Sequence, residues 1–281
     1  MEPVTLKAAK NFATAEVNRI VELETPVDAM ARLAAVDVDE VDYITLKARL
    51  DAEQIDSKGI KSQLSQTVYK TNYLLDKIRD SEAVDIFLCG DSITAGVGSS
   101  GYGLTATPIF TDSGGTTHYE ANHVSRSWAN LFRDFITDQN PLSTFFNAGI
   151  GGKYTNFFYA NREAYIPESK DIIFVMLGTN DRKQYATAEA FKTELASFLE
   201  YVDSMCNFLV VMSPTPLEPA YDTDSNFMQY EATGVIASLC KEKGYFYINN
   251  FHRTLEKAYL KNFRTWDILS DDAHPNNKGH A

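Results

Sequence analysis

The chain has no continuous apolar run approaching the roughly 20 residues that a membrane-spanning helix needs. Its amino terminus, MEPVTLKAAKNF, also lacks the basic stretch followed by an apolar stretch that marks a secretory signal. The sequence therefore predicts no membrane span, and it favours cytoplasmic synthesis without a signal peptide.

Basic residues are scarce as well. Lys and Arg number 26 against 38 Asp and Glu, which gives the 281 residues a net charge of -12. A nucleic-acid groove or an anionic membrane surface requires a basic face, so neither partner is expected. With 44% hydrophobic and 23% charged residues, the chain is not disordered or fibrous. It can bury one full-sized core and carry a smaller appendage.

Cysteine occurs only three times, and three thiols cannot all pair with one another. Cys89, Cys206 and Cys240 stand in or beside apolar runs. Small apolar-flanked cysteines are typical of buried free thiols. The sequence therefore favours free, buried cysteines over a disulfide framework.

Glycine and tryptophan are almost missing from residues 1–80, where Gly59 is the single glycine and no tryptophan occurs. Alanine, leucine, glutamate and lysine are common there, which predicts a helical region. Apolar or threonine residues recur at alternating spacings of four and three, at Ile60, Leu64, Thr67, Thr71, Leu74 and Ile78. The spacing fits a coiled-coil seam and, equally, one amphipathic helix lying on the main domain. A homo-oligomer formed through these helices is expected only under the first interpretation.

From residue 84 onward, short apolar segments alternate with helical patterns. Segments rich in Phe, Ile and Val, with little polar alternation, are typical of buried parallel strands. They predict strands at 84–89, 143–147, 171–177, 208–213 and 245–249, separated by helical patterns at 127–137, 187–203, 229–243 and 254–262. We therefore expect residues 81–281 to form a three-layer α/β sandwich around a central, mainly parallel five-stranded sheet.

Four short segments stand where apolar runs stop: GDS at 90–92, NAGIGG at 147–152, GTND at 178–181 and DDAH at 271–274. An open parallel sheet places its working residues at the carboxyl ends of its strands. Ser92 can present a hydroxyl there, and the glycines free backbone N–H groups to approach a ligand. Asn180 can donate its side-chain amide to the oxyanion that develops on such a ligand, or it can serve in an ordinary cap or Asx turn.

The fourth segment places Asp271 and His274 three residues apart. On one turn, this spacing lets the carboxylate hold one ring nitrogen while the other nitrogen faces a serine. A metal site is the competing interpretation, but no further cluster with metal-ligand spacing accompanies the pair. The remaining histidines are interpreted as surface or capping residues: His118, His123, His252 and His280. No metal or cofactor is predicted, and the segments together indicate ester hydrolysis through an acyl-enzyme.

A nucleotide site is a further alternative. Residues 96–101, GVGSSG, fit the dinucleotide fingerprint, and Glu120 lies about 20 residues later. The fingerprint requires its first glycine to follow a strand closely and its third to open a helix. Here residues 90–95 intervene, and residues 102–117 are expected to form a loop rich in Gly, Thr, Ser and Pro. The pattern is therefore not interpreted as a nucleotide site.

In this order, GDS, a glycine after the second strand, GxND and DxxHP resemble the SGNH, or GDSL-like, hydrolase family over roughly residues 84–281. The resemblance implies that Ser92 is the nucleophile, His274 the base and Asp271 its orienting carboxylate. It also implies an oxyanion hole formed by the N–H groups of Ser92 and Gly152 and by the Asn180 amide. Family members usually continue past HPN into a closing helix, whereas this sequence stops at Ala281. If the chain is a fragment, the resemblance implies a weakly anchored loop around Asp271 and His274 and a low activity.

A second likeness lies in the amino-terminal region. Residues 43–53, YITLKARLDAE, are similar to segments of tail and baseplate proteins from phages and prophages of Gram-positive bacteria. This likeness implies a virion-associated esterase that acts on acylated cell-surface polysaccharide.

The substrate is indicated only by the aromatic residues near the four segments. The insertion at 97–125 and the aromatic run at 157–159 either wall a pocket beside Ser92 or pack the loops. Because no long apolar stripe could receive a fatty chain, the sequence favours a short acyl group, acetyl on a carbohydrate. A lysophospholipase- or thioesterase-type lipid acylhydrolase and a non-catalytic tail-binding module are the alternatives.

Overall fold

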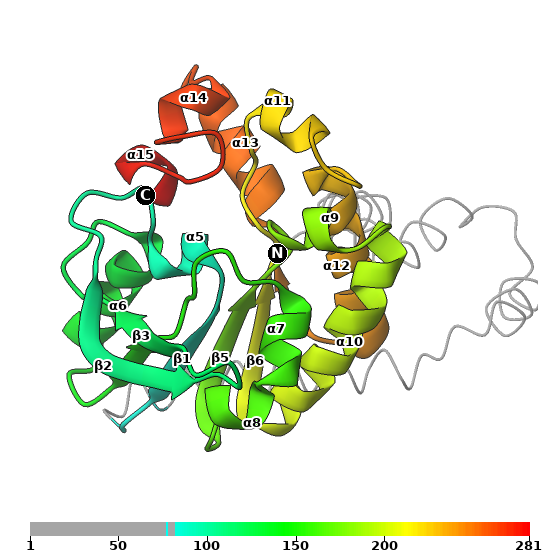
Figure 1. Ribbon diagram of the computed structural model, residues 1–281. Helices are drawn as coiled ribbons and strands as arrows, with labels where there is room; N and C mark the ends of the chain where they lie inside the picture. Colours follow the sequence, from blue (N-terminus) through cyan, green and yellow to red (C-terminus); the bar gives the residue numbers. More distant parts are fainter. Residues whose placement is uncertain (1–76, 78–81) are drawn as a thin grey trace, which may run out of the picture. The chain divides into compact units, whose positions relative to one another are not determined.

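The computed structural model describes residue 77 and residues 82–281. They form an α/β fold around a five-stranded sheet with strand order β4-β1-β5-β6-β7 (Figure 1). All neighbouring strands are parallel: β1 (Asp85–Gly90), β4 (Thr144–Asn147), β5 (Lys170–Met176), β6 (Cys206–Met212) and β7 (Phe246–Ile248). The five predicted strands are confirmed, with ends shifted by one or two residues. The predicted helical region at 1–80, the coiled-coil seam and the segment at 43–53 lie outside the described residues, apart from residue 77.

Helices connect the strands on both faces of the sheet. In chain order they are α5 (Ser92–Ala95), α6 (Trp128–Gln139), α7 (Thr155–Ala160), α8 (Arg162–Tyr165), α9 (Asp181–Gln184), α10 (Ala188–Ser204), α11 (Pro219–Thr223), α12 (Gln229–Lys243), α13 (Asn250–Leu260), α14 (Thr265–Ile268) and α15 (Asn277–His280). The hydroxyls of Ser127 and Thr187 accept from Asn130 N and Ala190 N, which caps α6 and α10. Within the described residues, no helix is both long and apolar enough to cross a membrane.

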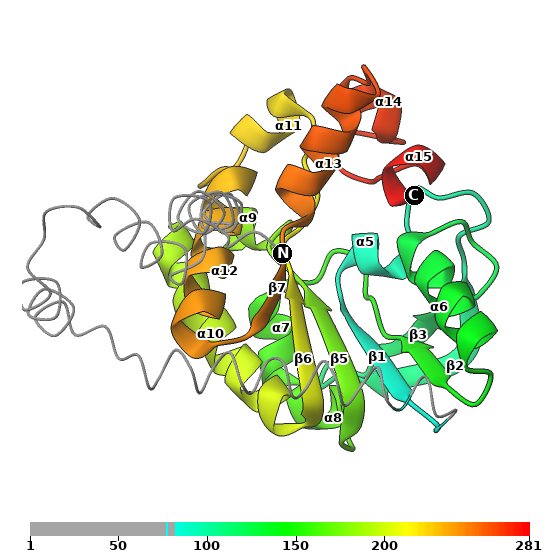
Figure 2. The ribbon, with the colours of Figure 1, turned by 180° about the vertical axis from the view of Figure 1, so that it is seen from behind.

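The sheet separates two hydrophobic cores. Successive side chains of a strand point to opposite faces, so Phe87 and Cys89 of β1 join one core and Ile86 and Leu88 the other. The first core is closed by α7, α8, α10 and α12, and the second by α6 (Figures 1 and 2). Strands buried on both faces explain why their sequences carry almost no polar alternation.

The segment between α5 and α6 differs from the sequence-based expectation. The loop predicted at 102–117 contains strand β2 (Leu104–Thr111), which pairs antiparallel with β3 (Thr117–Ala121). The Asp112 carboxylate closes the turn by accepting from Gly114 N and Thr116 N. Pro108 is tolerated because a two-stranded hairpin leaves open edges, and the register shifts beside it. A strand therefore comes after the GVGSSG pattern, where a nucleotide fingerprint requires a helix.

Candidate active site

Ser92 is the first residue of α5, directly beyond the carboxyl end of β1. The side chain of Asp91 caps this short helix by accepting from Ile93 N at 2.9 Å. The turn from strand to helix places the serine at the edge of the sheet where the other predicted segments also meet. Ser92 is largely buried, with 7% of its surface exposed.

The structure brings His274 and Asp271 to this serine across a separation of 182 residues. His274 Nε2 lies 2.9 Å from Ser92 Oγ, and its Nδ1 lies 2.8 Å from Asp271 Oδ2. One turn carries both the carboxylate and the imidazole, so Asp271 holds one ring nitrogen of His274 while the other faces Ser92, as the spacing of three residues predicted.

The second oxygen of Asp271 fixes this carboxylate. Oδ1 accepts from the backbone N–H groups of Ala273 and His274 at 2.8 and 2.7 Å. Partial burial raises the pKa of Asp271, but these bonds and the His274 ring outweigh it and hold the pKa below its usual value. An ionised carboxylate keeps the proton on Nδ1, which leaves Nε2 free to accept from the Ser92 hydroxyl.

The loop that carries His274 is well anchored, so the expectation of weak anchoring is wrong. Ser270 N donates to His274 O at 2.8 Å, and Asn276 Nδ2 donates to Leu269 O at 2.9 Å. Asn276 Oδ1 then caps α15 by accepting from Lys278 N at 2.8 Å. These contacts close the loop on itself and on the helix that comes after it.

His280 and Gly98 add to this anchoring. His280 is buried, with 6% exposed, and its Nε2 lies 3.4 Å from Val97 O, so of the two predicted roles the surface one is wrong. Its Nδ1 accepts from Trp128 N, the first N–H of α6, at 3.4 Å, which fits the capping role. Burial lowers the pKa of His280 to about 4, which keeps its ring neutral. Gly98 has φ +93°, and a β-carbon there would lie 2.4 Å from Pro275 O and 2.9 Å from His274 Cβ. The GVGSSG segment therefore makes room for the histidine loop.

The glycine-rich turn after β4 lies beside α5. A β-carbon on Gly149 would come within 2.3 Å of Ala95 N, whereas one on Gly151 would lie 3.8 Å from Ser92 Cβ. Gly152, the glycine predicted to donate to an oxyanion, is exposed and has φ +73°. Its N–H donates to no group in the described part of the chain. The turn thus reaches the serine through Gly151 and leaves the N–H of Gly152 available.

Asn180 lies just after β5 and is tied to the same turn. Its Nδ2 donates to Lys153 O at 2.8 Å, directly after Gly152 in the chain. The side chain makes no capping bond to α9, although the residue stands at the cap position. An amide group has two N–H donors. One is used on Lys153, which fixes the orientation of the other.

Sequence reasoning missed the two buried carboxylates that organise these loops. Asp181 accepts from Thr155 N at 2.9 Å and from Gly178 N at 3.0 Å, joining the loop after β5 to α7. Burial raises the pKa of Asp181 to about 6 against these bonds. Burial, together with the Asp181 charge, raises the pKa of Asp91 to about 7. Asp91 directly precedes Ser92 in GDS, and Asp181 directly follows Asn180 in GTND. These positions in the two motifs were the sequence signal that could have indicated them.

The raised pKa of Asp91 predicts a pH-dependent stability. The folded protein holds this proton to about pH 7, while the unfolded chain releases it near the ordinary value of 3.8. The folded state binds more protons between these values, so this group lowers stability as the pH rises through that window. For Asp91→Asn we expect the melting temperature, measured by circular dichroism, to rise relative to that of the parent as the pH increases from 3.5 to 7.5. A pH-independent difference would contradict the assigned burial.

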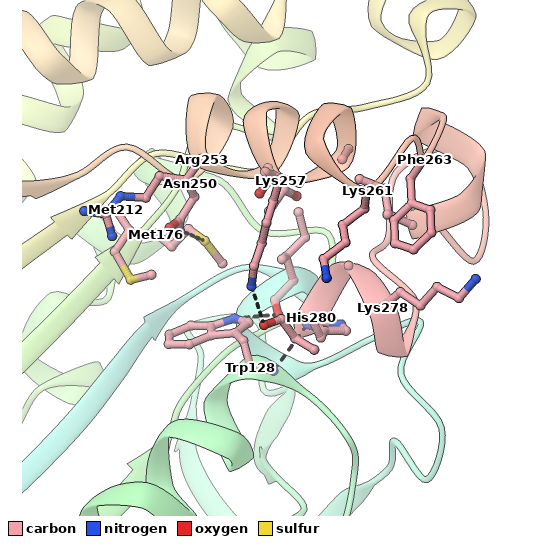
Figure 3. Close-up of a pocket in the computed structure, with 17 residues that line it drawn as sticks. Trp128, Met176, Met212, Asn250, Arg253, Lys257, Lys261, Phe263, Lys278 and His280 are labelled. Carbon is pink, nitrogen blue, oxygen red and sulfur yellow. Dashed lines mark hydrogen bonds between the residues drawn. The ribbon is translucent and has the colours of Figure 1, made fainter.

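A separate cavity of about 380 Å³ lies among α6, α13 and α15 (Figure 3). Trp128 and Met176 give it apolar walls, whereas α13 contributes Arg253 and Lys257, and Lys261 follows directly after that helix. Ser92 does not line this cavity. Among the described residues, no group of three or more His, Cys, Asp or Glu side chains gathers as metal ligands would.

Comparisons with known proteins concern the family and the fold of this chain. The sequence matches the model of the GDSL-like lipase/acylhydrolase family over residues 88–281, more than half of the chain. A catalytic mutant of an acetylxylan esterase from Geobacillus stearothermophilus is similar in structure, with TM-score 0.53 and 18% identity over 70% of this chain and 89% of that one. A two-domain esterase active on acetylated mannans, co-crystallised with mannopentaose, gives TM-score 0.56 and 19% identity over 76% and 50%.

No curated protein matches the chain by sequence. The likeness to the solved structures concerns the fold, and membership rests on the family model. By that match, the chain belongs to the GDSL-like lipase/acylhydrolase family of ester hydrolases.

Proposed function

We propose that this chain is a serine esterase that removes a short acyl group from a carbohydrate, with acetyl as the preferred group. The observation that carries the proposal is the continuous hydrogen-bonded series from Asp271 through His274 to Ser92, with distances of 2.8 and 2.9 Å. A nucleophile, a base and an orienting carboxylate in hydrogen-bond contact are the requirement for covalent acyl transfer.

In the proposed mechanism, His274 Nε2 takes the Ser92 proton while Oγ attacks the ester carbonyl carbon. The negative charge on the carbonyl oxygen is stabilised by the N–H groups of Ser92 and Gly152 and by the free amide proton of Asn180. The imidazolium then protonates the leaving alcohol, and the C–O bond breaks. Water, deprotonated by the same imidazole, attacks the carbonyl carbon of the acyl-enzyme. The bond from that carbon to Ser92 Oγ breaks, the imidazolium returns its proton to Oγ, and the acid is released.

The choice of a short acyl group rests on two supports. The cavity of Figure 3 is not lined by Ser92, so it does not provide an acyl-chain tunnel leading from this serine. The similar solved structures include esterases described as acting on acetylated xylan and mannan. The likeness of residues 43–53 to phage tail proteins extends the proposal to a virion-associated enzyme whose acceptor is a cell-surface polysaccharide.

Acetate release from acetylated xylan, mannan and bacterial surface glycans, compared between the parent and Ser92→Ala, tests the proposal. We expect release by the parent and none above background by the variant. A fluorophosphonate probe, which labels an activated serine, provides a second measurement. An unlabelled, inactive parent would leave the non-catalytic binding module as the explanation.

The acyl preference has its own test in a series of p-nitrophenyl esters. For the parent we expect kcat/KM to be highest with acetate and to fall at least about 10-fold by octanoate, because each unaccommodated methylene weakens transition-state binding. Rates are measured below the critical micelle concentration of each ester. A rise from acetate to octanoate would support the lipid acylhydrolase instead.

A further inference from the structure

Arg182, the second residue of α9, is a fully buried cation. Its side chain is 0% exposed, and it is among the largest fully buried side chains in the described part of the chain. A buried charge is retained only when it is paired and hydrogen-bonded. Nη1 donates to Asp222 Oδ1 and, at 2.9 Å, to Ser225 Oγ. The guanidinium is therefore held by the segment that begins with α11.

The other side of the guanidinium reaches the proposed oxyanion donor. Arg182 Nε donates to Thr179 O at 3.1 Å. This carbonyl belongs to the peptide unit that joins Thr179 to Asn180, so its orientation sets the direction in which the Asn180 side chain leaves the backbone. Asn180 is then fixed twice, through its own Nδ2 to Lys153 O and through this peptide unit.

Asp222 continues the connection toward the histidine loop. Its Oδ1 also accepts from Gln229 N at 2.8 Å, and Gln229 Nε2 donates to Thr215 O at 2.9 Å. Three residues after Thr215, Glu218 N donates to Asp272 O at 2.9 Å, next to Asp271. One network thus joins the loop that carries Asn180 to the loop that carries the imidazole.

Stability alone accounts poorly for this pair. A buried ion pair recovers little more than its desolvation cost, and apolar side chains of similar volume often stabilise as well or better. Here the Nη2 group of Arg182 has no hydrogen-bond partner among the described residues, which adds to the cost, although the guanidinium lies over the ring of Tyr221 at 5.8 Å. What the pair supplies that apolar residues cannot is a rigid, directional donor aimed at the Thr179 carbonyl.

We propose that Arg182 and Asp222 are a positioning pair that holds the Asn180 amide where the oxyanion develops. This inference rests on the proposed function, because it concerns the same site. The pair does not contact the reacting atoms and acts through the backbone of residues 179–180.

A double-mutant cycle on p-nitrophenyl acetate tests the pair. Arg182→Lys keeps a cation for Asp222 but removes the Nε donor to Thr179 O. We expect kcat to fall about 10-fold to 100-fold, the effect of a donor displaced by about 1 Å, with KM changed less than about two-fold. Adding Arg182→Lys to Asn180→Ala should cost little more than Asn180→Ala alone, because coupled residues are not additive. Multiplicative losses, or an unchanged kcat, would overturn the inference.

Lys170→Gln is the matched control. Lys170 stands at the opposite end of β5, 11% exposed in its side chain and paired with Asp85 at 2.9 Å. We expect its kcat to equal the parent's and its effect to multiply with that of Asn180→Ala. Should Arg182→Lys fail to fold by circular dichroism, the near-isosteric Asp222→Asn carries the same cycle. Amide hydrogen exchange over residues 177–185 should be faster in either variant and unchanged in Lys170→Gln.

The outcomes separate the two proposals. Hydrolysis that persists in Ser92→Ala, or is absent from the parent, defeats the proposed function and this inference together. A Ser92-dependent activity with multiplicative losses in the cycle and unchanged exchange at 177–185 defeats only the positioning pair.

Discussion

Replacement of His274 by alanine should lower kcat for p-nitrophenyl acetate by about 10⁶-fold while the protein stays folded. The expected loss is large because the imidazole removes the serine proton in acylation and supplies it to the leaving group. At 24% exposure its side chain contributes little to the hydrophobic core, so the melting temperature should change only slightly. Stopped-flow and long-time-course assays of the purified variant measure the residual rate.

His252→Ala is the control for this variant. His252 is exposed and in contact with an asparagine, Asn249, at 2.7 Å, but it lies on α13 and is not part of the hydrogen-bonded series from Asp271 to Ser92. Its kcat should stay within about two-fold of the parent's. Combining His274→Ala with Ser92→Ala should give no further loss, because the two residues act as one unit. A loss smaller than about 10-fold for His274→Ala, or a double variant much slower than either single one, would refute the assigned base.

Asn180→Ala should lower kcat by about 10² to 10³-fold with a small change in KM. The Asn180 amide is fixed by Lys153 O, so its second N–H is preorganised for charge that appears only in the transition state. Steady-state kinetics on p-nitrophenyl acetate give the two parameters separately. A variant as active as the parent would remove Asn180 from the oxyanion hole.

Asn161→Ala controls for the hydrogen bond that Asn180→Ala also removes. Asn161 Nδ2 donates to Phe157 O at 2.8 Å, the same type of bond at the end of α7. Both variants should therefore lose similar stability, about 1 kcal/mol for one such bond. Only the Asn180 variant should lose turnover. Equal losses of kcat in both variants would indicate that the turnover depends on the general rigidity of these segments and not on the Asn180 amide.

The parallel sheet and the Ser92, His274 and Asp271 geometry could be predicted from the sequence for two physical reasons. Strands buried on both faces have continuous apolar sequences, and parallel strands bring the loops at their carboxyl ends to one edge of the sheet. The hairpin of β2 and β3 was missed because Pro108 and the glycines before and after β2 are typical of loops, and the threonines, which favour strands, were counted with them. The burial of Asp91, Asp181 and Arg182 depends on distant segments packing over them, which no local pattern records.

Gly98 has a consequence for anyone who would transplant this chemistry. The short peptide with the carboxylate and imidazole fits against the α5 turn only because Gly98 leaves the space for it. A scaffold given that peptide, but carrying a bulkier residue at the facing position, would present its imidazole away from the hydroxyl. Transfer of this active site to another scaffold therefore requires both the loop that contains Gly98 and the loop that contains His274.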